Sequence, residues 1–157
     1  MITAFYRLAL CILIPLLVGG IAGFATIESV KTWYLTLNRP WFTPPNWLFG
    51  PVWTSLYCLM GVSLYLTIYK ANTKNINQII YVFTFQLLLN GLWSFVFFKW
   101  HLIAWALVNI VFLALAIMYM IVAFYKSNRL AAYLQIPYLL WVSFATCLNA
   151  GFWLLNN

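Results

Sequence analysis

Residues 102–125 read LIAWALVNIVFLALAIMYMIVAFY, a stretch without a charged side chain that decides the class of fold. An apolar helix needs about 20 residues to cross the hydrocarbon core of a bilayer, and this stretch is long enough. Four similar apolar runs accompany it, so the sequence predicts membrane-spanning helices at about 5–25, 47–69, 79–98, 102–125 and 130–155. The expected fold is an all-α polytopic membrane protein, with residues 1–157 forming a single bundle of five transmembrane helices.

The composition also indicates a membrane environment. Of the 157 residues, 66% are hydrophobic and only 6% are charged, which is atypical of soluble globular proteins. The net charge of +7 arises from eight basic side chains and one acidic side chain, Glu28. The basic residues are spread between the apolar runs and do not cluster on one face or in a tail, so a nucleic-acid partner is not expected. Membrane lipid is the first partner that the sequence predicts.

The basic residues are unequally divided between the two ends of the predicted helices. The end that holds the N-terminus carries Arg7, Lys70, Lys74, Lys126 and Arg129. The other end carries Lys31, Arg39 and Lys99, with Glu28 beside them. Cytoplasmic loops are enriched in Lys and Arg, so this distribution predicts a cytoplasmic N-terminus and an external first connection.

The first connection, residues 26–46, is rich in aromatic residues and proline where a polar linker would be expected. Two interpretations remain open. Trp and Tyr suit a boundary that is apolar on one side and wet on the other, so the segment can be an interfacial belt on the lipid headgroups. Proline reduces the entropy that a loop loses on ordering, so the segment can also be a lid folded over the mouth of the bundle.

Few residues are suited to acid–base catalysis or metal binding. Glu28 has no carboxylate partner, and His101, the only histidine, is expected to be solvated or to cap a helix. Cys11, Cys58 and Cys147 fall inside apolar runs, where a thiol behaves as a small hydrophobic group. No metal-ligand spacing is present. We therefore predict no metal site and no required cofactor.

Amide and aromatic side chains inside the predicted helices are the candidates for a binding site, because polar groups in a membrane tend to face the bundle interior. Three rows occur at helical spacing: Trp53 and Tyr57; Gln86, Asn90 and Trp93; Trp141, Ala145 and Asn149. The amides can serve simply to join helices by hydrogen bonds. Large aromatic residues beside small or amide residues on three helices also describe a pocket with stacking walls.

The segment WYLTLNRPWFTPPNWLFGPVWT at 33–54 carries a family resemblance, together with Gln86-x3-Asn90-x2-Trp93, Trp105-Ala106-Leu107-Val108-Asn109 and the 137–149 segment PYLLWVSFATCLN. These motifs resemble the translocator protein family, whose bacterial members are called tryptophan-rich sensory proteins. The resemblance covers nearly the whole chain. It implies a bacterial plasma membrane protein.

The resemblance further implies a pocket that opens toward the first long loop and binds porphyrins, sterol-like lipids and benzodiazepine-type synthetic ligands. The family's pocket positions fall on Tyr34, Pro44, Trp53, Tyr57, Asn90, Trp93, Trp141 and Ala145. Bacterial members are also associated with light-dependent breakdown of protoporphyrin, in which the positions matching Trp53 and Trp141 are implicated as catalytic. Members are commonly homodimers, but the small-residue spacing of some dimer interfaces is missing around Gly91.

Three function hypotheses follow. The leading one is a membrane receptor or binding protein for porphyrins and related flat hydrophobic ligands, acting in sensing, sequestration or transport. The second is a light-dependent porphyrin-degrading enzyme that works without acid–base catalysis. The third is a structural or regulatory membrane partner in which the pocket is incidental.

Overall fold

The computed structural model describes residues 2–71 and 75–157, so Lys74, one of the basic residues counted above, lies outside the described part. Apolar segments become helices in a membrane because a helix satisfies its own backbone hydrogen bonds. The helical elements are α1 (Ile2–Lys31), α2 (Trp33–Thr36), α3 (Asn46–Tyr65), η1 (Leu66–Lys70), α4 (Ile76–Ser94), η2 (Phe95–Lys99), α5 (Ile103–Ser127), α6 (Arg129–Tyr133) and α7 (Ile136–Leu155).

Within residues 2–71 and 75–157, five helical stretches are long and apolar enough to cross a membrane: α1, α3 with η1, α4 with η2, α5, and α6 with α7. The predicted all-α bundle of five transmembrane helices is therefore confirmed. The first helix continues to Lys31, beyond the predicted end of the first apolar run near Ala25. One helical turn, α2, also forms inside the first connection.

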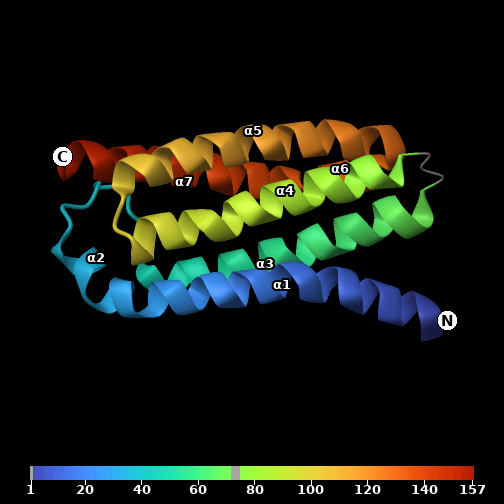
Figure 1. Cartoon of the computed structure of the whole chain (residues 1–157), viewed down its shortest axis with the longest axis horizontal. Coiled ribbons are helices and arrows are strands. Elements are labelled where there is room, and N and C mark those ends of the chain that lie inside the picture. The colour runs from blue at the N-terminus through green and yellow to red at the C-terminus, as the bar shows by residue number, and fades with distance from the viewer. Residues whose placement is uncertain (1, 72–74) are drawn as a thin grey trace.

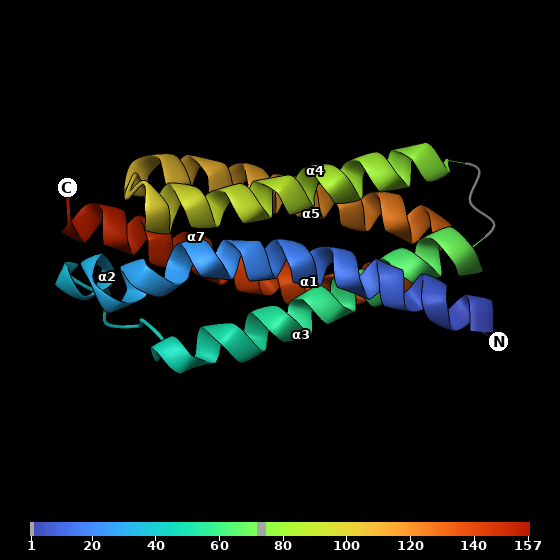
Figure 2. The ribbon, with the colours of Figure 1, turned by 60° about the horizontal axis from the view of Figure 1, so that its bottom comes forward.

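The five stretches run along one long axis, with the two termini at opposite ends (Figure 1). Helix α1 packs against α3 and α4, while α5 packs against both α4 and α7. The second view shows the same arrangement, with α2 and the C-terminus at the same end of the bundle (Figure 2). Elements from both the beginning and the end of the chain can therefore meet at this end.

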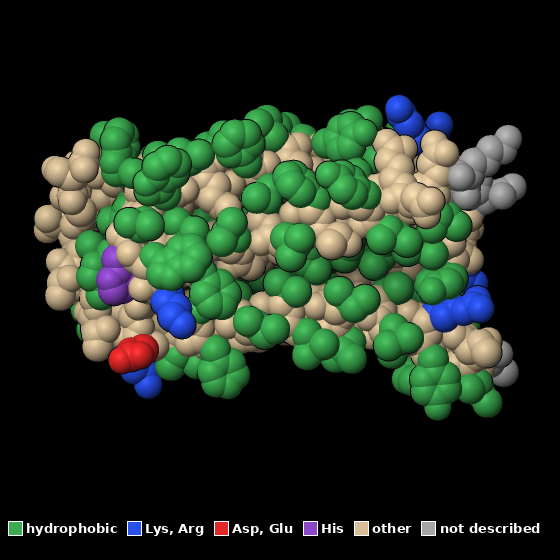
Figure 3. Space-filling model, in the orientation of Figure 1, with side chains coloured by type: hydrophobic (Ala, Val, Ile, Leu, Met, Phe, Trp, Pro, Cys, Tyr) green, Lys and Arg blue, Asp and Glu red, His purple; other side chains and the backbone are tan. Residues whose placement is uncertain are grey.

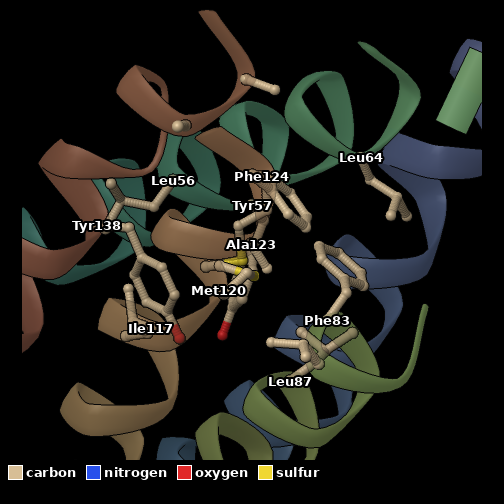
Figure 4. Close-up of a cluster of buried hydrophobic side chains, with 14 of the residues drawn as sticks. Leu56, Tyr57, Leu64, Phe83, Leu87, Ile117, Met120, Ala123, Phe124 and Tyr138 are labelled. Carbon is tan, nitrogen blue, oxygen red and sulfur yellow. The ribbon is translucent and has the colours of Figure 1, made fainter. Parts of the chain in front are cut away.

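The interior contains two groups of buried apolar side chains. The larger group includes Leu56, Phe83, Met120 and Phe124, which come from three different spans (Figure 4), and it extends to Ala131 of α6. The smaller group lies at the α2 end and includes Tyr34 of α2. The second group attaches the first connection to the bundle.

The outer surface is apolar along its length and charged toward its ends, as a lipid environment requires. Hydrophobic side chains cover the visible long side, and the Lys and Arg side chains visible in this view lie toward the two ends (Figure 3). Charged groups near the ends of a span can reach the headgroup region, while the apolar belt between them meets hydrocarbon.

The connection between α1 and α3 shows features of both the lid and the belt. Its α2 end is attached to α7: the Asn38 amide donates to Asn156 Oδ1 at 2.8 Å, and Asn156 Nδ2 donates to the Asn38 carbonyl at 2.9 Å. Pro40 is buried. Trp41, in contrast, is 95% exposed. One part of the connection covers the bundle, and another part points away from it.

Candidate ligand-binding site

A cavity of about 580 Å³ lies near the α2 end of the bundle. Most of its lining comes from α1, α3 and α7, with further residues from α2, α4 and η2. Pockets for small organic ligands are typically about 300–1,000 Å³ and mostly apolar, so this cavity has the size and character of a ligand site. Among the residues that the structure describes, Lys31 is the one charged residue in the lining.

Six of the eight predicted pocket residues line this cavity: Tyr34, Trp53, Tyr57, Trp93, Trp141 and Ala145. The helical spacing explains this arrangement, because residues one turn apart on α3 and on α7 share a face. The other two predicted residues, Asn90 and Pro44, do not line it. That the six residues contact a ligand stays a prediction.

Three helices each present an indole to the cavity. Trp53 of α3 stacks on Tyr57 with ring centroids 5.6 Å apart. Trp93 of α4 stacks on Phe97 at 5.5 Å, and Trp141 of α7 packs edge-on against Phe49 at 5.9 Å. Each indole is therefore held in place by a second aromatic ring. The result is a set of flat apolar surfaces around one space.

A buried hydrogen-bond network lies next to the cavity and includes Asn90. The Tyr57 hydroxyl donates to Asn90 Oδ1 at 2.7 Å, and Asn90 Nδ2 donates to the Tyr138 hydroxyl at 3.1 Å. Tyr138 in turn donates to Gln86 Oε1 at 2.9 Å. The Asn90 amide is thus occupied by tyrosines from α3 and α7, so it positions Tyr57 and does not face the cavity. Within the described residues, Gln86 Nε2 at the end of the network has no partner, while the paired groups fix the side chains of Tyr57, Asn90 and Tyr138.

Asn149 both joins helices by hydrogen bonds and lines the cavity. Its Oδ1 accepts a hydrogen bond from Trp93 Nε1 at 3.0 Å, and its Nδ2 donates to the Ile103 carbonyl at 3.0 Å. The side chain therefore joins α7 to α4 and to the start of α5, as an interhelical amide does. It also belongs to the cavity lining. By holding the Trp93 indole, Asn149 fixes the direction in which that ring faces.

Pro44 lies in the extended segment before α3, away from the cavity. It borders a separate depression formed by the connection itself, together with Arg39, Pro40 and Pro45. Pro45 is the residue directly before the first turn of α3. Because proline fixes φ and cannot donate a backbone hydrogen bond, the two prolines favour an extended approach to the helix. Asn46, the next residue, borders both this depression and the cavity.

Contacts of the first connection close the α2 end of the site. Trp33 stacks on His101 with ring centroids 4.1 Å apart, and Ser29 Oγ lies 3.2 Å from His101 Nε2. The Arg39 guanidinium lies 4.8 Å from the centroid of the Tyr34 ring. Burial raises the pKa of Tyr34, and the charge of Arg39 acts against this rise. Tyr34 is therefore neutral at physiological pH.

Comparison with known proteins agrees with this architecture. Residues 11–154 match the model of the TspO/MBR family. The chain belongs to the TspO/MBR family. Together with the five apolar spans, this membership shows that the chain is an integral membrane protein.

The relatives that the chain resembles come from archaea, bacteria and animals. It is 42% identical over 150 residues to the Tryptophan-rich protein TspO of Archaeoglobus fulgidus, covering 96% of this chain and 97% of that protein. It is 38% identical over 127 residues to the Translocator protein of Homo sapiens, covering 80% and 75%. It is 36% identical over 131 residues to the Tryptophan-rich sensory protein of Cereibacter sphaeroides, covering 83% and 81%.

In this TspO/MBR chain, α1 contributes cavity residues that the sequence did not reveal. A Cβ added to Gly20 or Gly23 would meet no atom within 4 Å, so both glycines leave open space beside the cavity. A Cβ on Gly19 would instead collide with the Tyr57 ring, so Gly19 allows α1 and α3 to approach closely. The spacing of Gly19 and Gly23 is visible in the sequence and indicates that two helices approach closely. It does not show which of the two glycines contacts another helix and which lies beside open space.

A second group that the sequence did not reveal comes from η2, whose Phe97 and Phe98 are adjacent and both line the cavity. The π-helical geometry over Phe95–Lys99 follows directly on α4. Wider turns of this type are often found at functional sites. No pattern in the sequence indicates where an α-helix changes to a π-helix, so this contribution required the structure.

Proposed function

We propose that this chain binds porphyrins and related flat hydrophobic ligands in the cavity, and that it acts in their sensing, sequestration or transport. The observation that carries the proposal is that Trp53, Trp93 and Trp141, from three different helices, border one apolar space. Aromatic contacts contribute about 0.5–1.5 kcal/mol each beyond simple burial. A flat conjugated ligand is the type of molecule that can contact several indoles at once.

The names of two relatives agree with this proposal. One relative is called a sensory protein and another a translocator. Both names describe proteins that respond to or move another molecule. The proposal applies the same kind of role to this chain on the basis of its cavity.

A substitution series with protoporphyrin tests the proposal. We expect Trp53→Phe and Trp141→Phe each to weaken binding by up to roughly tenfold, because each removes part of one stacking surface. Trp105→Phe on α5 is the matched control, since Trp105 is 66% exposed and outside the cavity lining. Binding is followed by fluorescence quenching in detergent, with thermal stability measured alongside. Equal affinity in all three variants would contradict the proposal.

Light-dependent porphyrin degradation is the second candidate, favoured by the position of the oxidisable indoles of Trp53 and Trp141 beside the same cavity. An illuminated porphyrin can pass its excitation to dioxygen, so such a reaction needs no acid–base pair. Illumination of the protein–porphyrin mixture in air separates the two candidates. Binding alone gives no product beyond those that free porphyrin forms under the same light, while turnover gives a new product that depends on the indoles.

The proposed orientation places the N-terminus in the cytoplasm of a bacterial cell and the α2 end outside, because basic residues are more numerous at the N-terminal end. We expect a single cysteine added after residue 157 to react with a membrane-impermeant maleimide in intact spheroplasts. A cysteine added before residue 2 should react only after lysis. The opposite labelling pattern would refute the orientation.

A further inference from the structure

The charge of the cavity is carried by one residue. Lys31 lines it, and every other described residue of the lining is neutral. Glu28, the one acidic residue of the chain, is one turn away on α1 but is not part of the lining. A ligand inside the cavity therefore meets one positive group and no negative group.

The position of Lys31 in the cavity is as important as its positive charge. Along α1 the lining extends from Leu16 to Lys31, the last residue of the helix. Fifteen residues of α-helix correspond to about 22 Å, so the cavity is elongated along α1 with its cation at one end. The Tyr57 ring lies against Gly19, near the Leu16 end of this stretch, and Trp53 stacks on Tyr57 and supplies further aromatic surface. A ligand aligned with the helix would have one end at Lys31 and its body between the rings.

We propose that Lys31 is a specificity-determining residue, which pairs with an anionic group on the ligand while the flat apolar body occupies the aromatic part of the cavity. This inference rests on the proposed function. It narrows the ligand class to amphiphiles with a carboxylate or similar anion at one edge, such as porphyrin acids. The Lys31 side chain is exposed and flexible, so it can reach such an anion without moving the helix.

Two simpler roles are available to a lysine at this place. It can interact with lipid headgroups at the membrane surface, and it can stabilise the C-terminal end of α1 through the helix dipole. Neither role depends on whether the ligand is charged. The charge of the ligand is therefore the variable that separates these roles from ligand recognition.

The experiment compares protoporphyrin, which carries two carboxylates, with its neutral dimethyl ester. Each is titrated into the wild type and into Lys31→Met, Lys31→Arg and Lys99→Met. Lys99 is the matched control, because it is exposed at the same end of the bundle and lies outside the lining. Thermal stability of each variant is measured to detect any general loss of structure.

We expect Lys31→Met to weaken binding of the acid by about fivefold, the upper range for a solvent-exposed charge pair, and to leave the ester unchanged. Lys31→Arg and Lys99→Met should keep the wild-type ratio of acid to ester affinity. The inference would be overturned if the ratio of acid to ester affinity in Lys31→Met stayed at the wild-type value, whether both affinities were kept or both fell equally. The proposed function would then still stand. If the wild type binds neither porphyrin, the proposed function fails and the inference fails with it.

Discussion

Replacing Ala145 with leucine is expected to weaken protoporphyrin binding by roughly five- to 150-fold while the bundle remains folded. Ala145 lies in the cavity wall, one turn after Trp141 and one turn before Asn149. A leucine there extends into the space that the ligand needs. In the free protein the added atoms enter an open cavity, so most of the overpacking cost, about 1–3 kcal/mol, falls on the complex.

The matched control makes the same chemical change where no cavity exists. Ala9 is exposed on α1 and is not part of the lining, so Ala9→Leu should bind porphyrin like the wild type. Ala145→Ser, which adds a single heavy atom, should have a much smaller effect than Ala145→Leu. Full affinity in Ala145→Leu would show that the ligand occupies another place. Loss of affinity together with a comparable loss of thermal stability would show that Ala145 is a packing residue.

The number of spans was predictable because it depends on a strong constraint. Backbone groups in hydrocarbon must be paired inside the segment, so each long apolar run must be a helix. The ends of the helices depend on weaker effects. The first helix continues through Glu28 to Lys31, and in this last part the Ser29 hydroxyl donates a hydrogen bond to the Phe98 carbonyl of η2. Apolar length alone does not reveal such contacts.

The aromatic walls were predictable from helical spacing on α3 and α7, where Trp53 and Trp141 each precede another lining residue by one turn. Asn90 follows the same spacing but is turned into a hydrogen-bond network, since its amide is held by Tyr57 and Tyr138. Spacing identifies the face of a helix. It does not tell whether that face meets a cavity or the side chains of another helix.

The contribution of α1 was the least predictable part of the site. This helix is apolar on all sides, so no periodicity in its sequence indicates which face meets the cavity. Gly19 and Gly23 differ by one turn and yet have opposite surroundings, one against Tyr57 and the other beside open space. The difference depends on how α1 packs against α3, a property of the assembled bundle.

Gly61→Ala is the substitution with the largest expected effect on stability, because Gly61 lies where α1 and α3 pack closely together. A Cβ at Gly61 would lie 2.7 Å from the Cys11 carbonyl oxygen and 2.7 Å from the Ile12 nitrogen, both backbone atoms. A side chain can rotate away from such a contact, but a helix backbone cannot. The two helices must separate, and we expect the free energy of unfolding to fall by about 1–3 kcal/mol.

Helix α1 is the element that should move. Its buried residues are few, Cys11, Pro15, Ala22 and Ser29, so little apolar surface holds it to the bundle. Cys11 lies at the contact itself and is 6% exposed. Displacement of α1 should therefore expose the Cys11 thiol. The rate at which a maleimide labels Cys11, in a Cys58→Ser and Cys147→Ser background, reports on this movement directly.

Gly20→Ala is the control that separates a steric effect from a general effect of replacing glycine. A Cβ there meets no atom within 4 Å, and alanine favours a helix over glycine by up to about 1 kcal/mol. We expect Gly20→Ala to unfold at the same or a higher temperature than the wild type and to keep Cys11 slow to react, whereas Gly61→Ala should unfold earlier and label faster. If Gly61→Ala matches the wild type in both measurements, α1 and α3 do not cross at Gly61 as the structure places them.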